Sequence, residues 1–403
     1  MKKIILSLLL CCASLVFIQA QNNEVSYSKL NNVFNLKVKN SAEKLTLTIK
    51  GDVRLGDDDK SITSISDEGS IYYRKKDQSL EVEDDGKGNL LYTTNGNKKS
   101  NLSAEDKALV EDCVQLLIDY GVDADNRVQR IFAQKGTSGV LNEVERFKSD
   151  YVKEMYLSYL LKNKKLSKDE MVTLLNKANQ YLSSDYYKAE LLNGVMGFFL
   201  ADEATSTAYL QTVNSISSDY YQSETVKKLL NNSLNEKQYQ QVMVIVSNMK
   251  SDYYQAEVVK KLLSNNDISD TRFAELMKIA GGMKSDYYKA EIISALLKSK
   301  SLNKDRYAQT IAAAQNIKSD YYQYNILSGL IDETITDEAA WSTLIQYAEK
   351  IGSDYYQAQM LMKIADKMPD SETLRKELGD AAKNIKSDYY YGQVMRSLGR
   401  KAA

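Results

Sequence analysis

Four glutamates recur at nearly equal spacing in the C-terminal two thirds of the chain, and they are candidates for acid–base chemistry. Each lies five residues after an aspartate of a repeated motif; the four are Glu190, Glu224, Glu257 and Glu291. Two carboxyl groups in one cleft can hydrolyse a glycosidic bond, one as general acid and the other as base or nucleophile. The competing interpretation is a solvent-facing row of acids paired with lysines such as Lys227, Lys260 and Lys261. We expect the paired row, with a carboxylate-dependent hydrolase as the alternative.

The chain contains no histidine. Every catalytic arrangement that needs an imidazole is therefore excluded, including Ser-His-Asp and Cys-His sites. His-ligated zinc and iron sites are excluded as well. We predict a protein without catalytic residues, metal or cofactor.

Two short acidic clusters, Asp57–Asp59 and Glu83–Asp85, contain oxygen ligands of the kind that calcium prefers. Neither fits the twelve-residue EF-hand loop, and we expect solvated turns at both. The run 86–89 (Gly-Lys-Gly-Asn) is too short for a phosphate-binding loop. The 53 basic and 54 acidic residues nearly cancel, which gives no support for a nucleic-acid partner.

The tetrapeptide Ser-Asp-Tyr-Tyr, or a close copy, occurs eight times, and its copies begin every 33 to 35 residues. The aspartates of the eight copies are Asp150, Asp185, Asp219, Asp252, Asp286, Asp320, Asp354 and Asp388. A period of this regularity is typical of stacked supersecondary units rather than of one globular core. The sequence therefore predicts a mostly helical protein, with an α-solenoid of about eight repeats over residues 149–403.

Each repeat has the pattern of two helices. In the repeat 251–283, apolar residues at helical spacing follow Asp252 and indicate the first helix. A polar turn lies at 265–267. A second apolar run, the second helix, starts after Ser269 or Asp270. Ser167 with Glu170 predicts a capping box at the start of another second helix, and Thr336 precedes a similar start. The unit has the size of tetratricopeptide-like repeats, although the signature residues of that family are absent.

We expect the repeated aspartate to be a helix cap. Its carboxylate can accept hydrogen bonds from the free N–H groups at the start of its own helix, and its charge favours the positive end of the helix dipole. Four glutamines lie three residues after their aspartates, where a reciprocal capping bond is predicted. These are Gln222, Gln255, Gln323 and Gln357.

The two tyrosines of the motif lie off the centre of the apolar face, by about 140° for the first and about 120° for the second at 100° per residue. One interpretation is that both rings pack at the seams between repeats. The other is that the second tyrosines form a binding column that grips a peptide or glycan. The residues of that column are Tyr187, Tyr221, Tyr254, Tyr288, Tyr322, Tyr356 and Tyr390.

The N-terminal third has a different composition. Residues 1–20 have the basic start, the apolar stretch and the cleavage site of a signal peptide, with Gln21 as the first mature residue. We expect a polar lead-in over 21–43 and a small antiparallel β-domain of four to six strands over 44–102. Asp85-Gly86 and Asn95-Gly96 predict hairpin turns. No other stretch is long and apolar enough for a transmembrane span.

Residues 103–148 are predicted to be bridging helices, one from Ser103 to Tyr120 and two shorter ones over 124–134 and 138–148. After cleavage only Cys113 remains of the three cysteines, and it cannot form an internal disulfide. We expect it to be a buried apolar residue, because no basic residue lies beside it to lower the pKa of its thiol.

Two segments resemble parts of exported bacterial helical-repeat proteins. Residues 49–55 (Ile-Lys-Gly-Asp-Val-Arg-Leu) with 62–66 resemble their small β-segment, and 127–131, 139–141 and 148–152 resemble the start of their repeats. Similar segments are attached to membrane metallopeptidases of the β-lactam-sensor type. The peptidase motif His-Glu-x-x-His is absent here, so the resemblance implies only an exported location and a role in sensing or scaffolding.

From these features we expect a non-enzymatic scaffold of the cell envelope, periplasmic, on the cell surface or secreted. Its partner would be a protein, a peptide or a glycan. A purely structural envelope component is the third function that the sequence leaves open.

Overall fold

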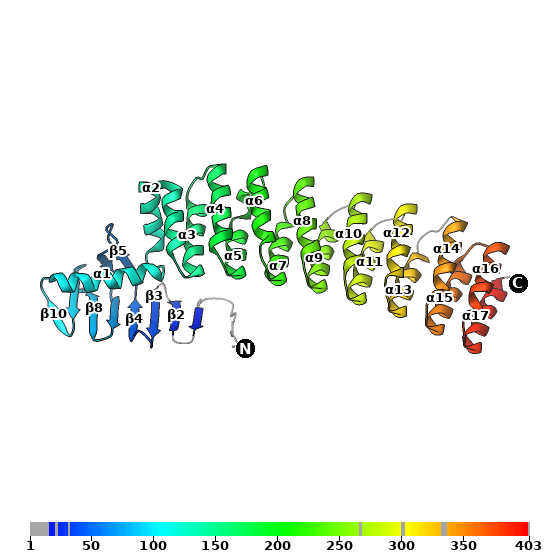
Figure 1. Cartoon of the computed structure of the whole chain (residues 1–403), viewed down its shortest axis with the longest axis horizontal. Helices are drawn as coiled ribbons and strands as arrows, with labels where there is room; N and C mark the ends of the chain where they lie inside the picture. Colours follow the sequence, from blue (N-terminus) through cyan, green and yellow to red (C-terminus); the bar gives the residue numbers. More distant parts are fainter. Residues whose placement is uncertain are drawn as a thin grey trace. The chain divides into compact units, whose positions relative to one another are not determined.

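The computed structural model describes residues 16–20, 23–30, 33–265, 268–299, 303–331 and 337–401. The chain divides into two compact units, Met1–Val195 and Met196–Ala403. The described residues form an antiparallel sheet followed by 17 α-helices in a repeating array, and 64% of the structure is helical (Figure 1). The predicted fold class, an α-solenoid preceded by a small β-domain, is confirmed.

The first unit begins with an antiparallel sheet of eight strands in the order β1-β2-β3-β4-β7-β8-β9-β10. The strands of this sheet are Val16–Ala20 (β1), Asn23–Leu30 (β2), Val33–Asn40 (β3), Leu45–Lys50 (β4), Ser70–Lys75 (β7), Gln78–Asp84 (β8), Leu90–Thr94 (β9) and Asn97–Lys99 (β10). Strands β5 (Val53–Leu55) and β6 (Ile62–Ile65) form a separate two-stranded sheet.

Side chains of the large sheet alternate between a buried and an exposed face. In β4, Leu45, Leu47 and Ile49 are buried while the residues between them are largely exposed, as the period of two requires. Helix α1 (Ala104–Asp119) lies across this sheet in Figure 1. The Tyr73 hydroxyl donates to Asp112 of α1 at 2.5 Å, which ties the helix to β7.

The predicted polar lead-in over 21–43 is wrong, because β2 and β3 lie there and belong to the sheet. Leu36 and Val38 are buried opposite Ile49 and Leu47 of β4. The lysines and asparagines at alternate positions make this segment polar overall, and they mask a regular strand pattern. Of the predicted signal peptide, residues 1–15 lie outside the described residues, while 16–20 form β1, which pairs with β2.

Both predicted hairpin turns are confirmed. Asn95 and Gly96, with φ of 50° and 78°, connect β9 to β10, and Gly86 has a φ of 77° between β8 and β9. The sheet is larger than the predicted four to six strands, because β1, β2 and β3 precede the segment in which strands were expected.

The bridging helices follow as predicted. Ser103 caps α1 in a capping box with Asp106. Helix α2 (Ala124–Arg146) is two helical segments joined at Gly136, whose φ of 64° and ψ of −164° break the helix between them. A residue with a Cβ is strained at such a φ, which explains the glycine.

Each repeat starts with a helix whose first residue is the motif aspartate. These first helices are Asp150–Asn163 (α3), Asp185–Val195 (α5), Asp219–Leu229 (α7), Asp252–Asn265 (α9), Asp286–Ser299 (α11), Asp320–Ile331 (α13), Asp354–Lys367 (α15) and Asp388–Lys401 (α17). The second helices are Lys168–Tyr181 (α4), Glu203–Asn214 (α6), Glu236–Asn248 (α8), Asp270–Gly282 (α10), Lys304–Gln315 (α12), Glu338–Ala348 (α14) and Glu372–Ala382 (α16).

Within the second unit the helices form two layers (Figure 1). Each first helix contacts the next first helix, from α7 through α17, and each second helix contacts the next second helix, from α6 through α16. Apolar residues such as Val258, Val259 and Leu262 are buried between the layers. No repeat buries its apolar face alone, so the stack supplies the core.

Side-chain caps start the second helices. Ser167 forms the predicted capping box with Glu170, and Asn235 forms another with Gln238. Ser269 caps α10; it is one of the two residues, Ser269 and Asp270, that were predicted to start this helix. Thr336 lies outside the described residues, and Asp337 caps α14.

Candidate functional site

Asp150, Asp219 and Asp354 do not cap their own helices, which corrects the prediction for these three motifs. Ser149, Ser218 and Ser353 occupy N-cap positions without side-chain cap bonds, and the aspartate after each is the first helical residue. A carboxylate there still lies at the favourable end of the helix dipole. Its oxygens, however, reach the loop that begins the next repeat.

This link between repeats recurs along the second unit. Asp219 Oδ2 accepts hydrogen bonds from the backbone N–H groups of Lys250 and Ser251 at 2.9 and 2.7 Å. Equivalent bonds, each to a backbone N–H one repeat ahead, join Asp252 to Lys284 and Ser285, Asp286 to Lys318 and Ser319, Asp320 to Gly352, and Asp354 to Ser387. The aspartate therefore holds the start of the following motif in place.

Asp150 makes the same link within the first unit. Its Oδ2 accepts from the backbone N–H groups of Ser183 and Ser184 at 2.8 and 2.7 Å, and Lys153 donates to Oδ1 at 3.0 Å. Burial alone would raise the pKa of the Asp150 carboxyl. The hydrogen bonds from Ser183 and Lys153 outweigh burial and hold this pKa below its usual value.

The glutamines of the motif do not form the predicted reciprocal capping bonds. Gln255 Nε2 donates to the carbonyl of Val246 at 2.9 Å, and Gln222 Nε2 donates to Val213 O and Ile216 O at 3.1 and 3.0 Å. These carbonyls lie in the last turn of the preceding helix (Val213, Val246) or just beyond its end (Ile216), where the regular helical hydrogen-bond pattern stops. Gln323 and Gln357 bond to Ile317 O and Glu349 O in the same manner.

These links position a continuous series of tyrosine rings in the second unit. Within a motif the two ring centroids lie 4.9 to 5.2 Å apart, and the first ring of one motif lies 5.8 to 6.2 Å from the second ring of the next. Most pairs are edge-to-face. We name this series the tyrosine ladder; its residues are Tyr220, Tyr221, Tyr253, Tyr254, Tyr287, Tyr288, Tyr321, Tyr322, Tyr355, Tyr356, Tyr389 and Tyr390.

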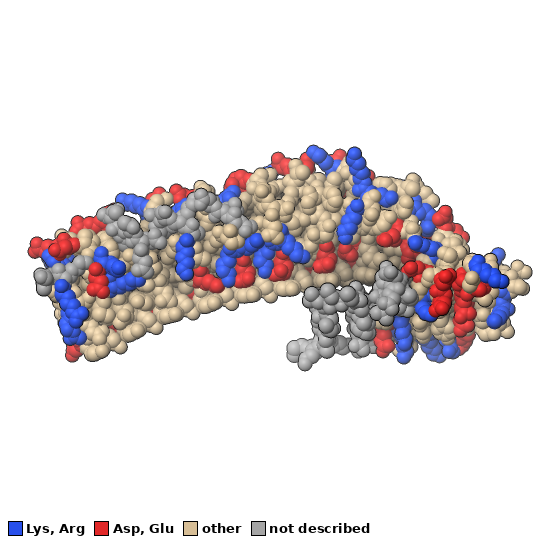
Figure 2. Space-filling model, turned by 180° about the vertical axis from the view of Figure 1, so that it is seen from behind, with Lys and Arg blue, Asp and Glu red and all other residues tan. Residues whose placement is uncertain are grey.

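The two columns of the tyrosine ladder differ in exposure. The second tyrosines, which were predicted as the binding column, are half-buried at the seams. The first tyrosines are exposed by 46% to 65% of their surface; they are Tyr220, Tyr253, Tyr287, Tyr321, Tyr355 and Tyr389. Viewed from behind, the second unit presents a long band of surface without charged side chains beside a band of mixed charge (Figure 2).

The exposed column was missed in the sequence, although a signal for it was present. The first tyrosine lies about 20° further from the centre of the apolar face than the second, at 100° per residue. Tyr187, the remaining residue of the predicted column, lies in the first unit. It is half-buried and contacts the rings of Tyr151 and Tyr186 at 6.1 and 5.0 Å.

Three of the four glutamates of the row show the predicted ion pairs, and Glu190 has no ion pair among the described residues. Glu224 binds Lys227, and Lys260 Nζ lies 2.6 Å from Glu257 and 3.0 Å from Glu291. An acid–base pair for glycoside hydrolysis needs two carboxyl groups that face one substrate. These carboxylates instead face ammonium groups of the same helix or of the neighbouring repeat.

One acidic cluster is a structural link rather than a solvated turn. Asp59 accepts hydrogen bonds from Arg127 Nη2 at 2.8 Å and from Arg130 Nη2 at 2.5 Å. Arg127, 4% exposed, also donates to Glu143 and to the Tyr156 hydroxyl at 2.8 and 3.0 Å. Burial alone would lower the pKa of Arg127. Hydrogen bonds to Asp59 and Tyr156 outweigh burial and raise this pKa above its usual value. The loop between β5 and β6 is thereby fixed to α2 and α3.

The other acidic cluster stabilises its own turn. Asp85 accepts hydrogen bonds from the backbone N–H groups of Lys87 and Asn89 at 2.8 and 3.0 Å, as expected for a solvated turn. Nowhere in the described ranges do three or more acidic or thiol side chains gather as a metal-binding group. Cys113 is fully buried without a disulfide partner, as predicted, and burial raises the pKa of its thiol.

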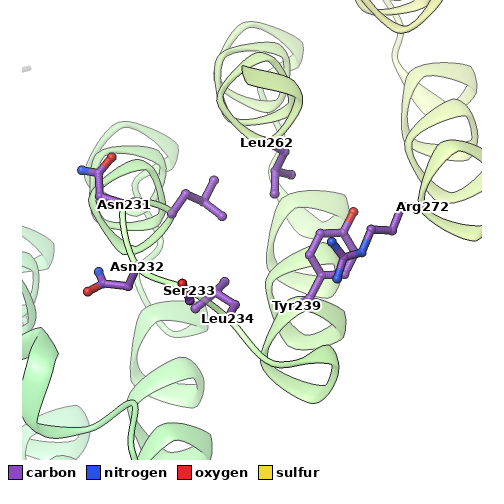
Figure 3. Close-up of a pocket in the computed structure, with 8 residues that line it drawn as sticks. Asn231, Asn232, Ser233, Leu234, Tyr239, Leu262 and Arg272 are labelled. Atoms are coloured by element: carbon purple, nitrogen blue, oxygen red, sulfur yellow. The ribbon is translucent and has the colours of Figure 1, made fainter. Parts of the chain in front are cut away.

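An open groove of about 410 Å³ lies between repeats of the second unit. Figure 3 shows the Arg272 guanidinium over the ring of Tyr239, opposite the loop of Asn232 and Ser233. The guanidinium carbon lies 4.0 Å from the ring centroid, and Arg272 Nη2 binds Glu236 at 3.0 Å. Glu236 already neutralises the charge of Arg272, so this guanidinium is less available to bind a ligand. The groove is therefore a weaker candidate for a binding site than the tyrosine ladder.

No known protein family matches this chain. No curated protein matches it either. Among solved structures, similarity was found to a chain described as "Computational Design of Self-Assembling Cyclic Protein Homooligomers". That chain is 12% identical, with 72% of this chain and 94% of that one covered, at a TM-score of 0.13. A likeness at this level carries no argument about function.

None of the helices formed by the described residues combines the length and the apolar character needed to span a lipid bilayer.

Proposed function

We propose that this chain is an exported, non-enzymatic scaffold of the cell envelope that binds an extended protein, peptide or glycan along the tyrosine ladder. The exposure of the first tyrosines carries this proposal. Six rings of the same type repeat along one unit while their half-buried partners hold them in place. Tyrosine offers a large, amphipathic contact at a low entropic cost, which suits a binding surface.

Rigidity of the surface supports the same function. Each exposed ring is held by a half-buried ring of its own motif and, except for Tyr389 of the last motif, by one of the next motif. The aspartate links fix the loop beside it. A surface ordered before binding loses little conformational freedom when the partner arrives. A contiguous exposed aromatic stripe is also more typical of an interaction site than of a monomer surface without a partner.

A role in sensing, as the resemblance to segments of β-lactam-sensor-type metallopeptidases implies, belongs to this proposal. A hydrolase gains no support, since Glu224, Glu257 and Glu291 are ion-paired. A purely structural role remains the rival explanation for the ladder, and the experiment below separates it from binding.

The test compares retention of envelope components on the immobilised full-length chain and on two variants. One variant carries Tyr253→Ala, Tyr287→Ala and Tyr321→Ala. The matched control carries Leu91→Ala, Phe198→Ala and Val244→Ala, three apolar side chains that are 48% to 57% exposed outside the ladder. We expect the same components to bind the native chain and the control, and to be lost from the tyrosine variant while its helicity is kept. Equal retention by all three would contradict the proposal.

Export is tested separately. We expect the protein in the periplasm, on the cell surface or in the medium, with an N-terminus at Gln21. Recovery of the chain from the cytoplasm with Met1 still attached would refute this part of the proposal.

A further inference from the structure

The hydroxyl groups of the exposed tyrosines have no partner within the described protein. Across that part of the chain, none of the six first tyrosines of the tyrosine ladder forms a hydrogen bond through its hydroxyl. Their rings contact other rings of the ladder, as Tyr253 does with Tyr254 and Tyr288. Each exposed ring therefore offers a ligand both an apolar surface and a hydroxyl donor that the fold does not use.

The spacing of the repeats limits which ligands can meet every exposed ring in the same way. The ring of Tyr220 lies 6.0 Å from that of Tyr254, which lies 5.0 Å from that of Tyr253. Successive first rings are therefore at most about 11 Å apart, in accord with the distance of about 8–10 Å between packed helices. A ligand in contact with all six rings must present equivalent groups at this interval and on one side.

A peptide in the polyproline II conformation satisfies this condition. It has about three residues per turn and rises about 3.1 Å per residue, so every third residue returns to the same side after about 9 Å. A β-strand does not satisfy it, because residues alternate between two sides at about 3.3 Å each and equivalent residues recur after about 7 or about 13 Å.

The unused hydroxyls distinguish a polyproline II helix from an α-helix. An α-helix returns to one side after two turns, about 11 Å, but its carbonyl groups accept hydrogen bonds within the helix. The tyrosine hydroxyls would then be covered without an acceptor, which costs free energy. The carbonyl groups of a polyproline II helix have no internal partner and can accept hydrogen bonds from these hydroxyls.

We infer that the tyrosine ladder, if it is the binding surface proposed above, takes a proline-rich peptide segment in the polyproline II conformation, with proline at every third position. Each of these prolines packs on one first tyrosine, and the hydroxyl of that tyrosine donates to a carbonyl group of the peptide. Aromatic-lined surfaces recognise such segments because the ligand is ordered before it binds. The motifs of the second unit carry six aspartates and four lysines, so charges of both signs lie near the rings and the partner needs no charge of its own.

The test titrates synthetic peptides into the full-length chain by isothermal titration calorimetry. The probe is a peptide of Pro-Gln-Ser repeats of about fifteen residues, which spans about 46 Å in the polyproline II conformation. The control peptide has the same composition with its prolines at irregular spacing. We expect the regular peptide to bind at least about tenfold more tightly, because only its prolines keep the interval of the rings. Equal binding of the two peptides, or no binding of either, would overturn the inference.

Two other classes of ligand are titrated alongside the proline peptide. One is an amphipathic α-helical peptide, and the other is dextran, an uncharged glycan. We expect neither to bind the ladder as tightly as the proline peptide does. Binding of either ligand in place of the proline peptide would overturn the inference.

Phenylalanine variants test the hydroxyls. The combination Tyr253→Phe, Tyr287→Phe and Tyr321→Phe keeps the rings and removes three donors, and it should weaken binding of the proline peptide about tenfold or more. The matched control removes three hydroxyls outside the ladder and should leave the affinity unchanged; it carries Tyr72→Phe, Tyr159→Phe and Tyr347→Phe. Unchanged affinity in the ladder variant would refute recognition of the peptide carbonyls.

The variant that carries Tyr253→Ala, Tyr287→Ala and Tyr321→Ala separates this inference from the proposed function. Loss of envelope components from this variant, together with no binding of the proline peptide to the native chain, would leave the binding function standing and refute the proline-rich partner. Equal binding of the proline peptide to the native chain and to this variant would also refute the inference. Retention of the envelope components by the variant would refute the proposed function and the inference with it.

Discussion

Asp252 Oδ2 accepts a hydrogen bond of 2.6 Å from the backbone N–H of Ser285, which lies one full repeat further along the chain. The same oxygen accepts the N–H of Lys284 at 2.8 Å. One side chain thus satisfies two backbone donors at the entrance of the next helix. The motif aspartate determines how a repeat meets its successor, and through that junction where the exposed tyrosines lie.

Replacing Asp252 with Ala should loosen this junction. Two backbone N–H groups would lose their acceptor, at a cost of about 1–3 kcal/mol for the part-buried donor. Hydrogen exchange should show faster exchange at Lys284 and Ser285 than in the native protein. Asp388→Ala is the control, because Asp388 has no such bond among the described residues. Unchanged protection in the Asp252 variant would refute the role of the link.

The motif glutamine should be sensitive to charge as well as to size. Gln255→Ala removes a donor to the carbonyls of Val246 and Ser247 and should cost about 1 kcal/mol. Gln255→Glu should cost more, because a carboxylate would face carbonyl oxygens at the negative end of a helix. Thermal unfolding followed by circular dichroism measures both. A glutamate variant as stable as the native chain would contradict the assignment.

The rings of neighbouring motifs should be energetically coupled. Tyr253 and Tyr288 have centroids 6.0 Å apart, and a double-mutant cycle with alanine should give a coupling of about 0.5–1.5 kcal/mol. Tyr253 and Tyr322 are not a contacting pair and should give additive effects. Tyr288→Ala should also destabilise the chain more than Tyr287→Ala, since Tyr288 is half-buried and Tyr287 is 51% exposed.

Acid should weaken the link made by Asp150. The pKa of Asp150 is lower in the folded protein than in the unfolded chain, where it is about 3.9. The carboxylate therefore stabilises the fold at pH values above about 3.9. This stabilisation is lost as the pH falls through the pKa of the folded protein. Asp150→Asn should therefore be less stable than the native chain near pH 7, and the difference should shrink below about pH 4. Unfolding by urea at several pH values measures it. A difference that grows in acid would contradict this sign.

The buried Arg127 should be hard to replace. Arg127→Met leaves the carboxylates of Asp59 and Glu143 without one of their cations, which typically costs about 3–5 kcal/mol. Arg146→Met is the control, because Arg146 binds Glu143 from an exposed position and such pairs contribute less than about 1 kcal/mol. A similar melting temperature for both variants would show that the network around Arg127 is not needed for stability.

The repeat length and the helix starts could be predicted because they depend on local patterns. The 34-residue period, the capping box at Ser167 and the turn at Asn95-Gly96 each follow from a few neighbouring residues. The strand Val33–Asn40 was missed because its alternating lysines and asparagines make it polar overall. Its burial depends on pairing with β4, which a local pattern does not include.

The roles of the motif residues could not be predicted in the same way. The contacts of Asp252 and Gln255 lie with other repeats, at sequence separations that capping rules do not cover. For the tyrosines, helix geometry did contain the answer, because the first ring points further from the core. That signal was outweighed by the expectation that both rings pack at the seams between repeats, with a binding column of second rings as the alternative.

The links between Asp286 and Ser319 and between Asp252 and Ser285 join only adjacent repeats, so no repeat depends on one far away in the array. Duplication or deletion of a complete 34-residue unit would recreate the same junction on either side. Loss of a few residues inside a unit would instead displace the aspartate from the backbone N–H groups that it binds. A change in length by whole repeats would therefore keep every junction intact, and each step would add or remove one pair of rings of the tyrosine ladder.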